Sequence, residues 1–127
     1  MFSHMMVGSN DLARSKKFYD ALFAATGGPE GISDPKGRLM YFHNGSIFMV
    51  TTPIDGQPAC HANGGTIGFA MTSPEQTDAW HAAGAAHGGT PIEDAPGLRE
   101  MNGLKLYLAY LRDPDGNKLC GLYRVAD

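Results

Sequence analysis

The fold is decided by the stretch Leu111–Cys120, which reads Leu-Arg-Asp-Pro-Asp-Gly-Asn-Lys-Leu-Cys. Pro-Asp-Gly between apolar residues favours a type I turn closed by a left-handed glycine, so the stretch predicts two antiparallel strands. A second such stretch, Tyr41–Met49, reads Tyr-Phe-His-Asn-Gly-Ser-Ile-Phe-Met. Its Asn-Gly pair predicts a two-residue hairpin, because both residues tolerate a positive φ. Met49 and Cys120 each lie four residues after the glycine of their turn, so the two positions are equivalent in register.

A short apolar strand and an amphipathic helix precede each hairpin. In the first half the strand begins at His4, and Asp11 caps the helix. In the second half the strand begins at Thr66, and Ser73–Gln76 is a capping box with proline at the first helical position. The residues at helical spacing on one side are Leu12, Ser15, Phe18, Tyr19 and Leu22 in the first helix and Trp80, Ala83 and His87 in the second. The chain therefore predicts one α+β domain of two strand–helix–strands modules, at about 1–58 and 64–127, with a linker at about 59–63.

Composition limits the class of protein. The chain has 127 residues, of which 43% are hydrophobic, enough for one globular domain with a core. Ten basic and thirteen acidic residues give a net charge of −3 without a basic run, which argues against nucleic acid or an anionic membrane as partner. No apolar stretch approaches the ~18 residues of a transmembrane helix, and the N-terminus lacks a signal-peptide layout. We therefore expect a cytoplasmic protein whose Cys60 and Cys120 are reduced thiols.

Two polar, glycine-rich stretches lie at matching places in the two halves. They are Gly27–Arg38 and Glu93–Gly103, each between a helix and the strands that follow it. We expect both to be loops. Long loops in compact domains are often functional, so they are candidates for mobile covers of a site, with ordinary exposed connections as the alternative.

Side-chain alternation gathers apolar residues around the two equivalent positions. Pairing across Asn44-Gly45 places Met40 opposite Met49, and the face that they share is completed by Phe42, Ile47 and Met6. Pairing of Asp113 with Asn117 places Tyr110 opposite Cys120, on a face shared with Leu108 and Leu122. Thioethers adapt their shape to varied ligands, so the methionine-rich face is either a pocket lining or an ordinary core.

The duplicated layout carries two further motifs, Ser-x-x-Phe-Tyr at 15–19 and Asp-Pro-Asp-Gly-Asn at 113–117. In this order and at this separation they resemble the vicinal oxygen chelate superfamily, which includes glyoxalases, bleomycin-resistance proteins and extradiol dioxygenases. The resemblance spans the whole chain. It implies two βαβββ modules whose sheets form an open, cupped β-barrel with the helices outside, and it implies a homodimer.

The resemblance also implies four metal-ligand positions, which here are His4, Met49, Thr66 and Cys120. Metal-dependent glyoxalases would carry His or Gln, Glu, His and Glu there. Of the residues present, His4 is an ordinary ligand, a threonine hydroxyl ligates poorly, and a thioether is unsuited to hard divalent ions. Cys120 as a thiolate would favour zinc or copper. We therefore assign no cofactor, with a divalent metal (Zn, Ni, Fe or Mn) as the alternative.

The favoured interpretation is a glyoxalase-like protein that has lost the standard metal site. It would bind a small, partly apolar molecule in the barrel cavity, either to sequester it or to catalyse a metal-free reaction. Arg112 is a candidate for binding a carboxylate on such a ligand. The residues expected to contact the ligand are Met6, Met40, Phe42, Met49, Thr66, Leu122 and Arg112.

Two enzymatic alternatives remain open. One is a metal-dependent lyase, isomerase or dioxygenase whose altered ligand set includes His4 and Cys120. The other is a metal-free enzyme in which Cys120 is the nucleophile and His4 the base. Tyr110 lies ten residues before Cys120, the spacing of a tyrosine before the ligating glutamate in extradiol dioxygenases. Its phenol could donate to a carbonyl or enediolate oxygen, and a core tyrosine is the alternative.

Overall fold

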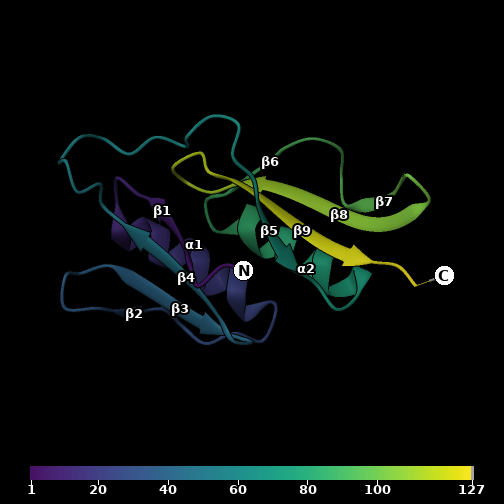
Figure 1. Cartoon of the computed structure of the whole chain (residues 1–127), viewed down its shortest axis with the longest axis horizontal. Coiled ribbons are helices and arrows are strands. Elements are labelled where there is room, and N and C mark those ends of the chain that lie inside the picture. Colours follow the sequence, from purple (N-terminus) through teal and green to yellow (C-terminus); the bar gives the residue numbers. More distant parts are fainter. Residues whose placement is uncertain (127) are drawn as a thin grey trace.

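Two modules of the same plan make up the computed structural model, which describes residues 1–126 (Figure 1). The first module contains β1 (Met5–Gly8), α1 (Leu12–Ala24), β2 (Ile32–Ser33), β3 (Leu39–His43) and β4 (Ser46–Thr51). The second contains β5 (Ile67–Ala70), α2 (Pro74–Ala86), β6 (Thr90–Pro91), β7 (Gly97–Met101), β8 (Leu104–Arg112) and β9 (Lys118–Arg124). A long connection without strands or helices, residues 52–66, runs between the modules (Figure 1).

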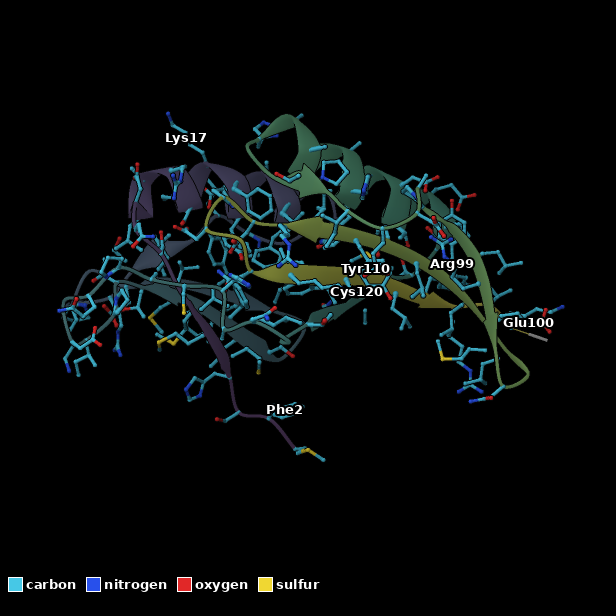
Figure 2. The ribbon with its side chains drawn as sticks, turned by 90° about the horizontal axis from the view of Figure 1, so that it is seen from above. Phe2, Lys17, Arg99, Glu100, Tyr110 and Cys120 are labelled. Carbon is cyan, nitrogen blue, oxygen red and sulfur yellow. The ribbon has the colours of Figure 1, made fainter. Side chains whose placement is uncertain are left out.

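Each module forms its own sheet. In the first sheet β4 pairs antiparallel with β3 and parallel with β1, and β2 completes the far edge. The second sheet repeats this arrangement with β9, β8 and β5, while β6 and β7 both pair with β8. Both helices lie on one side of the two sheets, and the N-terminal segment that carries Phe2 extends away on the other side (Figure 2). The α+β class and the duplicated plan are confirmed, and the two cupped sheets fit the expected open architecture.

The register predicted for both hairpins is confirmed. Met40 pairs with Met49 across the Asn44-Gly45 turn, and Tyr110 pairs with Cys120 across the Pro-Asp-Gly turn. Alternation along β4 and β9 then divides the side chains between two faces. The face toward the helices carries the core residues Phe48, Val50, Leu111 and Leu119. Met49 and Cys120 therefore point to the opposite face of their sheets.

Both helix caps form as the sequence predicts. The Asp11 carboxylate accepts the backbone N–H of Arg14, and the Ser73 hydroxyl accepts that of Gln76. The expected buried side of the first helix is confirmed, except that Leu12 is only partly buried. The expected buried side of α2 is wrong in part, since the buried residues there are Thr77, Trp80 and Gly84, with Ala83 half-buried and His87 exposed at the C-cap.

Gly84 explains the difference in α2. A Cβ built at this position would collide with Leu111 of β8 and come within 3.1 Å of Leu22 of α1. A residue without a side chain is therefore needed where α2 crosses both elements, and apolar periodicity does not select glycine for a buried position. The helices consequently pack closely, and the two modules share one core whose largest fully buried side chains include Trp80, Tyr19 and Phe18.

The expected loop at 93–103 is also wrong in part. Residues 97–101 form β7, which pairs along its whole length with β8. The connecting turn is Asn102-Gly103, with φ of 51° and 80°, the same conformation as Asn44-Gly45 with φ of 50° and 78°. The first expected loop, 27–38, contains the short strand β2 and a turn closed by the Asp34 N–H donating to the Arg38 carbonyl. Within residues 1–126 no helix has the length and apolar character needed to cross a membrane.

Candidate functional site

A buried carboxylate fastens the two modules together at the carboxyl end of β1. The Asp113 carboxylate accepts the hydroxyl of Tyr19 at 2.5 Å, the side-chain amide of Asn117 at 2.8 Å and the backbone N–H of Asn117 at 2.9 Å. The Asn117 amide also donates to the Gly8 carbonyl at 3.3 Å. Burial, followed by the charge of Asp113, raises the pKa of Tyr19 well above its ordinary value, so the phenol remains a donor.

Asp115 extends this contact to the start of α1. Its carboxylate accepts the Arg14 guanidinium at 2.7 Å, the backbone N–H of Asn10 at 2.9 Å and the Ser15 hydroxyl at 3.3 Å. We call the set Ser15, Tyr19, Asp113, Asp115 and Asn117 the module lock. The two motifs noted in the sequence, 15–19 and 113–117, are therefore bonded to each other, and their role in this structure is to hold the modules in a fixed relation.

The four positions implied as metal ligands carry poor donors for a hard divalent ion. His4 is exposed just before β1, with its Nδ1 2.8 Å from the Ser3 hydroxyl, and Thr66 is exposed just before β5. Met49 and Cys120 are buried. Burial raises the pKa of the Cys120 thiol, which disfavours the thiolate needed for ligation or nucleophilic attack. Nowhere in the described part of the chain do three or more His, Cys, Asp or Glu residues group as a metal site would require. The residues present therefore do not fit the metal of the glyoxalases.

The face around Cys120 combines the aromatic ring of Tyr110 with a charged pair, Lys118 and Glu93. Tyr110 and Cys120 lie next to each other on β8 and β9 (Figure 2), and burial raises the pKa of both side chains. The Lys118 ammonium lies 5.0 Å from the centre of the Tyr110 ring and forms an ion pair with Glu93. Arg112 donates to the Gly116 carbonyl at 2.7 Å and so braces the turn. The remaining residues of the predicted lining are half-buried or exposed; they are Met6, Met40, Phe42 and Leu122.

A cavity of about 340 Å³ lies between the two modules. The cavity is lined by aromatic side chains that face the core and also by residues on the opposite face of the sheets. They come from the N-terminal segment, the end of α1, the β3–β4 hairpin, β5 and α2. The aromatic wall consists of Phe23, Tyr41, Phe48, Phe69 and Trp80, and the polar groups include Ser3, His4, His43 and Asn44. Of the predicted site residues, His4 and Phe42 line this cavity and the others do not.

One feature of the sequence could have indicated this cavity. Along β5, Gly68 and Ala70 alternate with Ile67 and Phe69, so one face of the strand carries almost no side-chain volume. A Cβ placed on Gly68 would meet no atom within 4 Å. Phe23, Phe69 and Trp80 could be expected in a core from the sequence, but their exposure to a shared cavity depends on how the modules meet.

Comparison with known proteins agrees with this architecture. The family model of the Glyoxalase/Bleomycin resistance protein/Dioxygenase superfamily matches residues 1–120. A glyoxalase/bleomycin resistance protein from Albidiferax ferrireducens T118 is 59% identical, with a TM-score of 0.93 over 98% of this chain and 99% of that one. The chain therefore belongs to the Glyoxalase/Bleomycin resistance protein/Dioxygenase superfamily, and the resemblance noted from the sequence is confirmed. No curated protein matches the sequence.

More distant solved structures share the fold alone. The hypothetical protein SA1046 from S. aureus is 19% identical, with a TM-score of 0.74 over 97% of this chain and 93% of that one. A lactoylglutathione lyase from Agrobacterium tumefaciens is also 19% identical, with a TM-score of 0.67 over 97% of this chain and 92% of that one. A shared fold does not fix a function, so the function must be argued from the residues of this chain.

Proposed function

We propose that this protein binds a small, partly apolar molecule in the cavity between its modules without using a metal. The observation that carries the proposal is the coexistence of an aromatic cavity with unsuitable residues at the metal-ligand positions. A binding protein needs a concave, mostly apolar site with a few placed polar groups. The glyoxalase/bleomycin-resistance description of the Albidiferax protein is consistent with such a role here.

The size and chemistry of the cavity support this proposal. Its volume of about 340 Å³ lies at the lower end of the range of ligand pockets, roughly 300–1,000 Å³, and suits a molecule of one or two rings. The aromatic wall favours an apolar or aromatic body, because rings pack edge-to-face on other rings. His4, His43 and Asn44 contribute polar groups that an apolar core would not contain. A ligand with an apolar body and a polar end fits this division.

A blocking substitution tests where the ligand binds. We expect the hydrocarbon tetralin to bind wild-type protein in isothermal titration calorimetry. We expect Gly68→Leu to weaken this binding at least about tenfold, because Gly68 lines the cavity and its position leaves room for a side chain. Glu100→Leu is the matched control, since Glu100 lies on β7 far from the cavity (Figure 2). Equal affinity of Gly68→Leu and wild type would reject the cavity as the site.

Elemental analysis tests the metal-independent part of the proposal. Untagged protein is incubated with nickel, zinc, manganese and iron(II) in turn, dialysed, and measured by mass spectrometry with inductively coupled plasma. We expect well under one metal per chain. We also expect Thr66→His with Met49→Glu and Cys120→Glu to bind metal, because it supplies imidazole and carboxylate donors beside His4. Stoichiometric metal in the parent that His4→Ala removes would overturn the proposal.

A further inference from the structure

We propose that Phe2 is a ligand-contacting residue, whose ring folds over the bound molecule and covers it where the cavity opens to solvent. This inference rests on the proposed function, because it concerns the ligand of the same cavity. Phe2 lines the cavity, and yet the residue is 78% exposed. A residue that belongs to the wall and is also exposed to solvent lies at the opening. A ligand in the cavity therefore comes within reach of Phe2.

The segment that carries Phe2 is anchored directly beside the aromatic wall. Met5 is the first residue of β1 and pairs with Phe48 of β4, and Phe48 is one of the rings in that wall. Phe2 lies three residues before Met5, so an extended chain of about 3.3 Å per residue gives the ring a reach of roughly 10 Å from this anchor. That range includes the part of the cavity that Phe2 and Phe48 already line together.

Residues 1–4 can change position without breaking the sheet. They precede β1 and take no part in the strand pairing described within residues 1–126. The side-chain hydrogen bond described for this segment joins the Ser3 hydroxyl to Nδ1 of His4 at 2.8 Å, so it does not tie the segment to the sheets. Figure 2 shows the segment with Phe2 extending away from them. Strand pairing therefore does not fix the position of the Phe2 ring.

Phe42 shows that exposure alone does not identify the residue that covers the ligand. It also lines the cavity and is 44% exposed. Its backbone, however, is held inside β3, where it pairs with Ile47 of β4. Other rings of the wall, such as Tyr41 and Trp80, are buried. Within residues 1–126, Phe2 is the aromatic lining residue that combines exposure with a backbone outside the strands and helices.

The hydrophobic effect favours closure of Phe2 over a ring-containing ligand. Removing apolar surface from water is favourable, roughly in proportion to the area buried. A ligand held against the aromatic wall presents its outer edge at the opening, and the Phe2 ring can pack on that edge in an edge-to-face or offset-stacked arrangement. Ligand and ring then both lose exposed apolar surface. A ligand therefore gains affinity from Phe2 in proportion to the apolar surface that it presents at the opening.

Substitution of Phe2 tests whether its ring contributes to binding. We expect Phe2→Ala to weaken the binding of tetralin about tenfold in isothermal titration calorimetry, because the ligand loses its aromatic cover. We expect Phe2→Trp to bind within about threefold of wild type, because it restores an aromatic ring. Ile54→Ala is the matched control, since Ile54 is fully exposed and is not among the residues that line the cavity. Its affinity should equal that of wild type.

A nuclear Overhauser measurement tests the contact directly. Wild-type protein is labelled with ¹³C on phenylalanine and saturated with unlabelled tetralin, and the Phe2 ring signals are assigned by their absence from the spectrum of Phe2→Ala. We expect cross-peaks between the protons of tetralin and those of the Phe2 ring, because such peaks arise only between protons in close contact. A loss of affinity in Phe2→Ala without these cross-peaks would mean that Phe2 acts without touching the ligand, and it would overturn the inference.

The outcomes separate this inference from the proposed function. Equal affinity of Phe2→Ala and wild type would overturn the role of Phe2, whereas weaker binding by Gly68→Leu would still support the cavity as the ligand site. Absence of tetralin binding by wild type would overturn both the role of Phe2 and the proposed cavity. A loss in Ile54→Ala as large as that in Phe2→Ala would show that the effect is not specific to the cavity, which also overturns this inference.

Discussion

The two ends of the interface between the modules differ in chemistry, since one is a polar network and the other is lined by aromatic rings. At the end near Asp113, the modules meet through a buried carboxylate whose two oxygens accept four hydrogen bonds, from Tyr19, Asp115 and both nitrogens of Asn117. At the end near Trp80, they meet around a cavity walled by rings, and within residues 1–126 the Trp80 indole nitrogen has no hydrogen-bond partner. A satisfied network specifies one arrangement of the modules, whereas a buried donor without an acceptor costs stability. The first end therefore serves the fold, and under the proposed function the second end is the one that binds a ligand.

The largest expected effect comes from breaking the module lock. Asp113→Ala leaves the hydroxyl of Tyr19 and the backbone N–H of Asn117 without their acceptor, and we expect it to lower the free energy of unfolding by about 3–5 kcal/mol. Urea denaturation measures the loss. Asp55→Ala is the control, because Asp55 accepts the N–H of Gln57 in an exposed turn, and it should cost under about 1 kcal/mol. Similar losses in the two variants would mean that the lock is no stronger than a surface turn.

A smaller effect is expected when one donor of the lock is removed. Tyr19→Phe deletes the hydroxyl that donates to Asp113 but keeps the ring in the core, and the carboxylate retains its other three donors. We expect a loss of about 1–2 kcal/mol in urea denaturation. The double variant with Asp113→Ala should lose clearly less than the sum of the two single losses, because the two residues share one interaction. Additive losses would contradict the direct bond between the modules.

Asp20 makes the stability of the fold near the cavity depend on pH, because its carboxylate links α1 to β3. Its carboxylate accepts the Tyr41 hydroxyl at 2.8 Å, the Gly31 N–H at 2.9 Å and the Lys16 ammonium at 2.5 Å. Burial alone would raise the pKa of Asp20, but these donors outweigh burial and lower it below the ordinary value of 3.8. A depressed pKa stabilises the fold above the unfolded-state value, and this contribution is lost as the pH falls through the folded-state pKa.

The corresponding variant is Asp20→Asn. We expect it to cost about 1 kcal/mol at pH 7 and progressively less below pH 3.8, as the wild-type carboxylate becomes protonated. Thermal unfolding followed by circular dichroism between pH 2 and 7 measures the difference. A difference that stays constant across this range would show that charge on Asp20 contributes nothing.

The smallest expected effect lies at the cavity end. Gly68→Ala adds a methyl group where no atom lies within 4 Å and where φ is not in the left-handed region, so we expect a change in stability within about ±0.5 kcal/mol. Gly84→Ala is the matched contrast, because its new methyl group would collide with Leu111, and we expect a loss of about 1–3 kcal/mol. Thermal denaturation measures the stability of both variants. A clear loss of stability in Gly68→Ala would show that Gly68 is tightly packed and would contradict the expectation.

Much of the fold could be predicted from the sequence because local turn chemistry fixes it. Asn44-Gly45 and the Asp113–Asn117 turn determine strand direction and register, so the Met40–Met49 and Tyr110–Cys120 pairs follow from counting residues. The β7–β8 hairpin carried the same Asn-Gly signal at Asn102-Gly103, but the polar residues around it favoured a loop. The sequence therefore contained the turn motif, but the polar residues on either side of it led to the prediction of a loop.

The candidate site was less predictable because it depends on how the modules approach each other. Alternation along a strand assigns Met49 and Cys120 to a face, but it does not show where two faces enclose space. That space depends on close contacts at Gly84 and Gly121, which set the positions of α2 and β9. The Trp80 nitrogen finds no hydrogen-bond partner in the part of the chain that the structure describes, and this too depends on the assembled core, since any buried tryptophan has the same N–H before its neighbours are known.

The most direct test of the account is a map of where tetralin perturbs the amide spectrum of the ¹⁵N-labelled wild type. We predict that the amides of 42–48 and 67–71, which border the cavity, shift during the titration, and that the amides of 113–117 in the module lock do not. Shifts centred instead on Tyr110 and Cys120, or spread equally over both ends of the interface, would contradict the division between a structural end and a binding end.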